Sequence, residues 1–350
     1  MLKGKIAIVT GGGQGIGKHA AKTLAKVGVK VAIVDINPET ASQASVELSA
    51  LSETTHLSLD VRNEKDVNSA FDKVAILNKI MSDYDSTSEL SRLSNLAGSG
   101  KAARISDSLF QVSQAGQLLG GRTDGAFDVT SGASTRLWRQ ARRLKRVPPE
   151  DAIKIANNSS GYRYLKLDKF LKTAELLKDG MRLDLGGIAK GFALDEAFKL
   201  LISKGFSKVL VSAGGDILVG EPPPGKQGWK IALLGLGDSV TEYIFLKNCA
   251  VATSGDLFQF LEFGGKRYSH IIDPRTGAAI SEQRLVHVLA PKAMQADSLA
   301  TAISVIGQKD GLRLVAGDKR LAARIAFRNK SGQVKKKSNQ AFKAWPRVDE

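Results

Sequence analysis

The alternation of short β-rich runs with helical runs across residues 5–74 constrains the fold of this 350-residue chain more than any other feature. The β-rich runs are residues 5–9, 29–34 and 56–59, and helical patterns begin after Ile16 and at Pro38. Strands that alternate with helices are typical of parallel βαβ units. The sequence therefore predicts a partial Rossmann-like βαβαβ unit at the N-terminus.

A glycine-rich turn, T-G-G-G-Q-G-I-G at residues 10–17, joins the first strand to the first helix. Glycines there let the backbone approach a pyrophosphate at a helix N-terminus. Asp35 ends the second strand, where a carboxylate accepts hydrogen bonds from an adenosine ribose. Together with the pair Asp60 and Val61, these residues resemble the start of the short-chain dehydrogenase/reductase family. The resemblance implies NAD as the ligand of this segment.

The later motifs of that family do not follow. The string Asn95-Leu96-Ala97-Gly98 lacks the apolar strand that should precede it, and Tyr162 and Lys166 lie in an alternating pattern that predicts a strand rather than a shared helix face. Half a Rossmann unit cannot transfer a hydride without an acid and a substrate pocket. An NAD-dependent oxidoreductase therefore remains an alternative function, and the segment can equally be a remnant or a fusion.

Amino-acid composition limits the classes of ligand that the protein is expected to bind. Lys and Arg outnumber Asp and Glu by 51 to 35, which favours anionic ligands. Nucleic acid is not expected, because the densest basic run, residues 136–146, contains only Trp138 as a stacking residue. Cys249 is the only cysteine, so an internal disulfide is excluded. We expect a cytoplasmic protein, since the sequence shows neither a signal-peptide core nor the roughly 18 apolar residues of a membrane span.

Residues 181–205 combine a short apolar run, two glycines and a helical pattern that ends at Gly205. We expect a short strand, a turn at Gly186 and Gly187, and a helix whose N-terminus is surrounded by free backbone N–H groups, Asp184 and Lys190. Such a site suits a phosphorylated ligand. The alternative is an ordinary turn in which Asp184 caps the helix.

Residues 296–307 predict a second helix, on which Asp297 and Thr301 share one face because they are four residues apart. A carboxylate and a hydroxyl are oxygen ligands of the kind that Mg²⁺ prefers. Taken alone, an aspartate at this position is more often a helix cap, so the weight of Asp297 comes from the motifs around it.

These two segments belong to an ordered series of motifs. The others are Ser82-Asp83-Tyr84, S-E-L-S-R-L at residues 88–93, T-D-G-A-F-D-V-T at 123–130, G-G-D-I at 214–217, A-T-S-G-D at 252–256 and Y-S-H-I-I-D-P-R-T-G at 268–277. In this order the motifs resemble the ApbE family of FAD:protein FMN transferases, from about residue 80 to 326. The resemblance implies a domain with a mixed, mostly antiparallel β core and flanking helices, and an overall α/β to α+β fold.

The resemblance also implies a reaction. Members of the family cleave the FAD pyrophosphate, attach FMN to a Ser or Thr hydroxyl of an acceptor protein and release AMP. Carried over by position, the FAD contacts are Tyr84, Ala126, Phe127, Asp128, Asp184, Lys190 and Ile272. Asp297, Thr301 and the carbonyl of Gly187 would hold Mg²⁺, and His270 would accept the hydroxyl proton.

The acceptor signature implied by the family is Asp-x-x-Ser/Thr-Gly-Ala-Ser/Thr. Residues 128–134, D-V-T-S-G-A-S, are similar to it, so self-modification at Ser134 or Thr135 is an alternative to a separate acceptor protein. The small residues there can also serve only to let the backbone approach the flavin.

One departure puts activity in question. The family's first strand, with its Met-Gly-Thr motif, is replaced here by the dehydrogenase-like piece. We therefore expect a partial dinucleotide-binding segment at residues 1–74 and a flavin transferase domain at 75–345. Three functions remain open: a Mg²⁺-dependent flavin transferase, an NAD-linked oxidoreductase and a non-catalytic FAD-binding protein.

Overall fold

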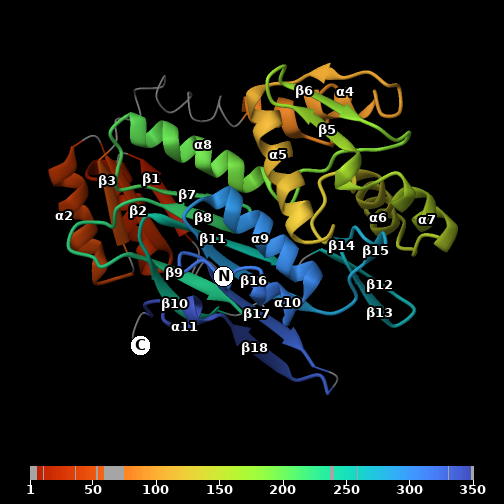
Figure 1. Ribbon diagram of the computed structural model, residues 1–350. Coiled ribbons are helices and arrows are strands. Elements are labelled where there is room, and N and C mark those ends of the chain that lie inside the picture. The colour runs from red at the N-terminus through yellow and green to blue at the C-terminus, as the bar shows by residue number, and fades with distance from the viewer. Residues whose placement is uncertain are drawn as a thin grey trace. The chain divides into compact units, whose positions relative to one another are not determined.

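The computed structural model describes residues 6–10, 12–35, 37–52, 54–58, 75–236, 240–257, 259–329 and 331–347. They divide into two compact units, Met1–Asp72 and Lys73–Glu350. Figure 1 shows the elements of both units. Asp60 and Val61 lie outside the described residues.

The first unit is a three-stranded parallel sheet with two helices. Its elements are β1 (Ile6–Thr10), α1 (Gly15–Lys26), β2 (Lys30–Asp35), α2 (Pro38–Ser49) and β3 (Thr54–Ser58). Strand β2 pairs in parallel with both β1 and β3, as the alternating pattern predicts. Pro38 begins α2, and Asn37 caps it by accepting from the backbone N–H groups of Glu39 and Thr40. The core consists of alanines on the two helices, Leu48 of α2, and Val29, Val31 and Ile33.

The second unit is built around a six-stranded antiparallel sheet of order β18-β17-β16-β11-β8-β7. These strands are β7 (Leu210–Ala213), β8 (Asp216–Val219), β11 (Cys249–Gly255), β16 (Arg284–Ala290), β17 (Ala322–Arg328) and β18 (Val334–Ser338). Helices α8 (Ala189–Ser203) and α9 (Ala293–Ile306) pack on this sheet and on each other (Figure 1). Because their contact faces are almost entirely apolar, this layer forms the main hydrophobic core.

Smaller elements surround this layer. Residues 75–81 are helical, and the other helices are α4 (Glu89–Ser94), α5 (Asp107–Arg122), α6 (Gly132–Leu144), α7 (Glu150–Asn158), α10 (Asp310–Arg313) and α11 (Gln340–Lys343). The sheet β4-β6-β5 consists of Ala103–Arg104, Thr173–Leu176 and Leu165–Asp168. Three two-stranded ribbons are β9 (Trp229–Leu234) with β10 (Val240–Leu246), β12 (Phe260–Phe263) with β13 (Lys266–Ser269), and β14 (Ile272–Asp273) with β15 (Ala278–Ala279). The predicted mostly antiparallel core is therefore confirmed.

Two local predictions were wrong. The strand expected before Gly186 is only an isolated bridge between Ser131 and Arg182, because the backbone there bonds to the turn that leads into α6. Tyr162 is not in a strand but in a 3₁₀ turn, η1 (Tyr162–Tyr164), because its backbone N–H donates to Asp128 at 2.7 Å.

No helix in the described part of the chain has the length and apolar character needed to cross a bilayer. The cytoplasmic location stays a prediction.

The core of the second unit contains a buried histidine. His287 on β16 is 1% exposed, and its Nε2 lies 2.9 Å from the carbonyl oxygen of Leu234, which can only accept a hydrogen bond. Nδ1 therefore accepts from the Thr253 hydroxyl, 3.1 Å away. Burial lowers the pKa of His287 to about 4.

This pKa predicts a specific acid sensitivity. The unfolded chain binds a proton near pH 6.5 and the folded chain only near pH 4, so the stability that neutral His287 maintains above pH 6.5 is lost as the pH falls from 6.5 towards 4. Between pH 7 and 4.5 we expect the free energy of unfolding to fall by about 2 kcal/mol more in the wild type than in His287→Gln. Urea unfolding followed by tryptophan fluorescence measures the difference. Equal pH dependence of the two proteins would contradict the assignment.

Candidate functional site

One lysine joins the two helices of the main layer to the sheet. Lys190, in the first turn of α8, lies with its Nζ 2.9 Å from Asp297 Oδ1 on α9 and 3.4 Å from Asp216 Oδ2 on β8. The second oxygen of Asp297 accepts from the backbone N–H of Gly191 at 3.1 Å. Both carboxylates are buried, whereas the Lys190 side chain is 42% exposed. The cluster is thus open to solvent on its cationic side.

Local backbone geometry places Asp216 in this cluster. Gly214 and Gly215 both have positive φ values, 57° and 93°, which side chains other than glycine rarely adopt. They form the tight β7–β8 turn, and a Cβ added at Gly214 would lie 3.3 Å from Lys190 Cδ. The sequence motif at residues 214–217 contains Asp216, but no sequence pattern indicates that Asp216 shares Lys190 with Asp297.

The electrostatics of the cluster favour an additional cation. Burial would lower the pKa of Lys190, but the charges of Asp297 and Asp216 outweigh it and raise this pKa. Burial, together with the Asp297 charge, raises the pKa of Asp216 to about 6. Asp216 Oδ2 has no hydrogen bond of good geometry among the described residues, although it pairs with Lys190 at 3.4 Å. Two buried carboxylates sharing one ammonium leave a net negative charge.

The predicted metal ligands lie around this charge. A Cβ added at Gly187 would be 3.1 Å from Thr301 Oγ1, so the backbone of Gly187 and the hydroxyl of Thr301 are adjacent. Thr301 follows Asp297 by one helical turn on α9. These groups fit a hard divalent cation. In the described residues no three or more His, Cys, Asp or Glu side chains form a metal-binding group, so any such cation would depend on hydroxyl and carbonyl oxygens.

Neither Asp184 nor Asp297 is a helix cap. Helix α9 begins at Ala293, earlier than predicted, because Asp195 accepts from the N–H groups of Ala293 and Met294 at 2.7 and 3.0 Å. Asp297 therefore lies one turn inside the helix. Asp184 accepts from the N–H of Gly186 at 2.7 Å, in the turn that precedes α8.

A second cluster lies around Arg139 of α6. The guanidinium donates to Asp83 Oδ2 at 2.7 Å, lies 3.8 Å from Asp184 Oδ2 and covers the ring of Tyr84 at 4.0 Å. Tyr84 is 77% exposed, so the side of this cluster that carries the Tyr84 ring is accessible to solvent. Burial, followed by the charge of Asp184, raises the pKa of Asp83. Arg139 was missed because the sequence shows it only as one of six cations in a basic run.

The loop with Ala126, Phe127 and Asp128 is almost fully buried. Asp128 Oδ1 accepts from the N–H and the hydroxyl of Thr130 at 2.8 and 2.7 Å, and Oδ2 accepts from the N–H of Tyr162. Asp128 therefore holds the loop together through both oxygens. The Phe127 ring reaches the Gly187 turn, where an added Cβ would be 3.3 Å from its Cε2. Their predicted FAD contacts stay predictions.

His270 lies beside these clusters in a defined tautomer. Its Nδ1 is 3.1 Å from the carbonyl oxygen of Gln259, so Nδ1 carries the proton and Nε2 is free to accept one. Burial lowers the pKa of His270, and the charges of Arg142 and Lys190 lower it further. A neutral imidazole at neutral pH is the form that acts as a base.

Ile272 anchors the His270 segment to α6. It is 7% exposed and belongs to a small core with Trp138, Ala141 and Leu261. Trp138 stacks on Tyr268 with ring centroids 5.5 Å apart, and its Nε1 donates to the carbonyl of Gly277 at 2.8 Å. Ile272 thus packs within the protein, and its predicted contact with FAD is untested.

Two other expectations concern hydroxyl and phenol groups. Ser134 is buried inside α6 and Thr135 donates to the Ser131 carbonyl, so both side chains belong to the helix packing. Tyr162 and Lys166 lie on different elements, a 3₁₀ turn and β5, and do not form the pair that a short-chain dehydrogenase requires.

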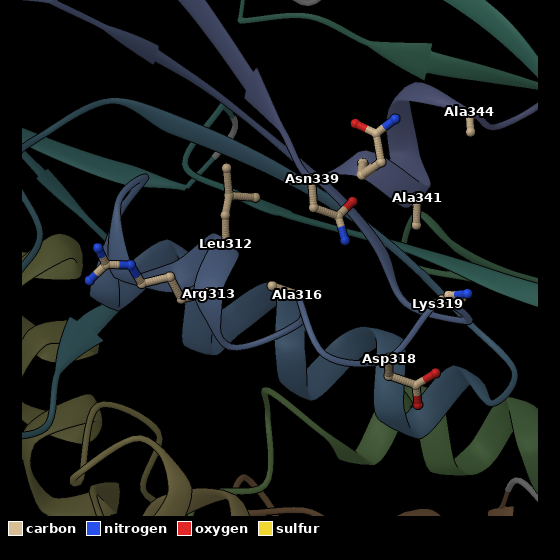
Figure 2. Close-up of a pocket in the computed structure, with 9 residues that line it drawn as sticks. Leu312, Arg313, Ala316, Asp318, Lys319, Asn339, Ala341 and Ala344 are labelled. Atoms are coloured by element: carbon tan, nitrogen blue, oxygen red, sulfur yellow. The ribbon is translucent and has the colours of Figure 1, made fainter.

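A cavity of about 680 Å³ lies elsewhere in the second unit (Figure 2). Its lining comes from α10, the turn that follows it and α11. None of the predicted site residues contributes to it.

In the first unit, Asp35 is held by the glycine-rich turn. Its Oδ2 accepts from the N–H of Gly13 at 2.9 Å and its Oδ1 from the N–H of Asn37 at 3.1 Å. A Cβ at Gly13 would lie 2.8 Å from Asp35 Oδ2, so glycine is required at this approach. NAD binding by this unit stays a prediction.

Comparison with known proteins adds an independent finding. A sequence model described as the ApbE family matches residues 43–325. The FAD:protein FMN transferase of Haemophilus influenzae is 33% identical over 306 residues, which cover 85% of this chain and 84% of that protein. The FAD:protein FMN transferase of Treponema pallidum is 30% identical over 275 residues, covering 73% and 76%.

Solved structures similar to this chain also come from ApbE proteins. The flavin transferase ApbE from Vibrio cholerae superimposes with a TM-score of 0.73 at 28% identity, covering 81% of this chain and 91% of that one. The ApbE protein from Thermotoga maritima gives a TM-score of 0.72 at 30% identity, covering 81% and 92%.

The approach of α8 to α9 that forms the cluster predicts an effect of Gly191→Ala. An added Cβ would lie 2.3 Å from the Ala293 carbonyl oxygen, so the helices must separate. Alanine gains up to about 1 kcal/mol in helix propensity, but we expect overpacking to dominate and destabilise the protein by about 1–3 kcal/mol.

Thermal unfolding measures this effect. The matched control is Gly317→Ala, whose Cβ would have no atom within 4 Å and should leave Tm nearly unchanged. Equal Tm values for Gly191→Ala and the wild type would show that the two helices do not meet as described.

Proposed function

The chain belongs to the ApbE family, and on this premise we propose that it transfers FMN from FAD to a Ser or Thr hydroxyl of an acceptor protein and releases AMP. The observation that carries the proposal is the cluster of Lys190 with two buried carboxylates, bordered by Thr301 and the Gly187 turn. Phosphoryl transfer depends mainly on positioning and charge neutralisation, which is what such a cluster supplies.

We propose Mg²⁺ as the cation that this site takes. Asp297, Thr301 and the Gly187 carbonyl would hold it, and the buried negative charge shared by Asp297 and Asp216 supports the assignment. When bound, Mg²⁺ polarises phosphoryl oxygens and neutralises developing charge. Lys190 is close enough to act on the same phosphates once a competing cation relieves its ion pairs.

The proton of the attacking hydroxyl needs an acceptor. The hydroxyl oxygen would form a bond to the phosphorus of the FMN half, and the bond from that phosphorus to the bridging oxygen would break, with AMP leaving on the electron pair. Nε2 of His270 would take the hydroxyl proton, since Nδ1 is bound to the Gln259 carbonyl. Its lowered pKa keeps it neutral and ready near pH 7.

The flavin half would be bound at the second cluster. The exposed ring of Tyr84, fixed under Arg139, offers a flat surface for stacking. We propose that the buried side chains of Phe127 and Ile272 support the flavin site from inside the protein. Asp184 and Asp128 would contribute by fixing the backbone turns whose N–H groups donate to them. The proposed acceptor is a flavoprotein that carries an Asp-x-x-Ser/Thr-Gly-Ala-Ser/Thr sequence.

The test of this function is incubation of the protein with FAD, Mg²⁺ and a peptide that carries Asp-x-x-Ser-Gly-Ala-Thr. We expect AMP release together with a peptide mass increased by one FMN. FAD binding without turnover would favour the non-catalytic FAD-binding alternative, and AMP without peptide modification would indicate hydrolysis.

We predict that His270→Ala lowers kcat by about 10²–10⁴-fold with little change in FAD affinity, because the variant lacks only the proton acceptor. In the wild type, the acid limb of the pH profile should lie below pH 6.5, since burial lowers the pKa of His270. The exposed His19→Ala is the control and should behave as wild type. Retained activity in His270→Ala would exclude the imidazole as the base.

We also predict that Asp297→Asn raises the Mg²⁺ concentration for half-maximal activity by at least about 10-fold, since it removes a charged ligand. Calorimetric titration with Mg²⁺ measures the same loss without turnover. The control is Asp310→Asn, at an exposed position on α10. Unchanged Mg²⁺ binding in Asp297→Asn would contradict the proposed ligand set.

A further inference from the structure

One face of α6 carries a row of cations. At 3.6 residues per turn, Arg136, Arg139, Arg142 and Arg143 fall within an arc of roughly 120°, and residues 132–149 contain no acidic side chain. Lys145 and Arg146 extend the positive charge beyond the helix end. Trp138 and Ala141 lie outside this arc and are buried in the protein. We call this row, with Lys145 and Arg146, the α6 basic face.

Most of this charge has no ion-pair partner among the described residues. Arg139 pairs with Asp83, but no described carboxylate pairs with Arg136, Arg143 or Arg146, and all three are exposed. A surface of like charges destabilises the folded chain unless it attracts an anionic partner. Such a surface is therefore expected to serve recognition.

Arg142 is the most informative member of the row. Its guanidinium is partly buried and feels the charge of Arg139, while its own charge acts on His270, and none of the described carboxylates acts on it. Burial, together with the charge of Arg139, lowers the pKa of Arg142. Desolvating a cation without a counter-charge is costly. The described residues thus supply no anionic group to Arg142, whose charge acts on the imidazole that would receive the acceptor's proton.

The α6 basic face is rigidly connected to that base. Trp138 stacks on Tyr268 and donates to the Gly277 carbonyl, so α6 packs against both sides of the segment that carries His270. In Figure 1, α6 lies beside α7, and it also contacts β12. Anything bound along the outer face of α6 would be held at a fixed position relative to Nε2 of His270.

We propose that the α6 basic face docks the acceptor protein through an acidic segment next to the modified hydroxyl, with Arg142 binding the acidic side chain nearest to His270. This inference rests on the proposed transferase function. Charge complementarity favours an acidic polypeptide. A nucleic acid would also need a row of exposed aromatic groups for stacking. The only aromatic side chain of α6 is buried Trp138, and the single exposed ring beside the face, Tyr84 on Arg139, is the one assigned to the flavin. Electrostatic docking of this kind selects partners and accelerates association.

The test uses two fluorescent peptides with the same Asp-x-x-Ser-Gly-Ala-Thr core, one flanked by four Glu and the other by four Gln. Binding to the full-length protein is measured by anisotropy, without FAD, at low and at physiological salt. We expect the acidic peptide to bind at least about 10-fold more tightly at low salt, with a preference that shrinks as salt is added.

The decisive variant is Arg136→Gln/Arg143→Gln/Arg146→Gln, which removes three exposed charges. It should lose most of the preference for the acidic peptide, keep the wild-type FAD affinity and unfold at a Tm no lower than that of the wild type. The matched control, Lys319→Gln/Lys335→Gln/Lys337→Gln, which we call the β18 control, removes three exposed charges, two on β18 and one in the turn after α10, and should keep the preference. Arg142→Gln should lower the preference and also raise the apparent pKa of the acid limb, because the Arg142 charge lowers the pKa of His270.

Three results would overturn the inference: equal affinity of the wild type for both peptides, an equal loss in the α6 variant and the β18 control, or tighter binding of a 20-nucleotide single strand than of the acidic peptide. The proposed function fails separately. If the acidic peptide binds selectively but neither peptide gains FMN in the presence of FAD and Mg²⁺, transfer is contradicted while the docking surface stands.

Discussion

The second unit depends on one shared ammonium group. Lys190 compensates Asp216 and Asp297, two buried carboxylates that come from different layers of the fold, and it does so at the point where α8, α9 and β8 meet. Without it, two like charges would be buried close together, which strongly opposes folding. The close helix approach at Gly191, the Gly214–Gly215 turn and the capping of α9 by Asp195 all serve to bring these three side chains together. The same arrangement leaves a negative excess that a divalent cation and a pyrophosphate can use.

The turns around the Lys190, Asp216 and Asp297 cluster connect it to the other groups that the proposed reaction needs. Gly187 links it to Thr301 and Phe127, Asp184 links it to Arg139 and Tyr84, and α6 links Arg139 to the His270 segment through Trp138. A cation site, a flavin surface and a base are therefore parts of one packed structure. Their rigidity is what phosphoryl transfer requires, because positioning rather than covalent chemistry supplies most of the rate.

Sequence patterns predicted the elements that depend on local periodicity. The βαβαβ order of the first unit, helices α8 and α9 and the common face of Asp297 and Thr301 follow from spacing alone. The ordered motifs indicated the family, which the comparisons bear out. Spacing does not predict which distant residues pair in the folded protein. Asp216 pairs with Lys190 across 26 positions, and Arg139 pairs with Asp83 across 56. The tautomer of His270 depends on a carbonyl 11 positions away. The strand expected before Gly186 failed for the same reason, since its backbone partner is the turn at Ser131.

The central claim is that the Lys190, Asp216 and Asp297 cluster is the cation and pyrophosphate site. The most direct measurement is a crystal structure with FAD and Mn²⁺, in which anomalous scattering locates the metal. The account predicts one peak in contact with Asp297 and Thr301 beside the Gly187 carbonyl, with the Lys190 ammonium moved from Asp297 to the phosphates. Ordered FAD with no metal peak there, or with its pyrophosphate bound away from Lys190, would contradict it.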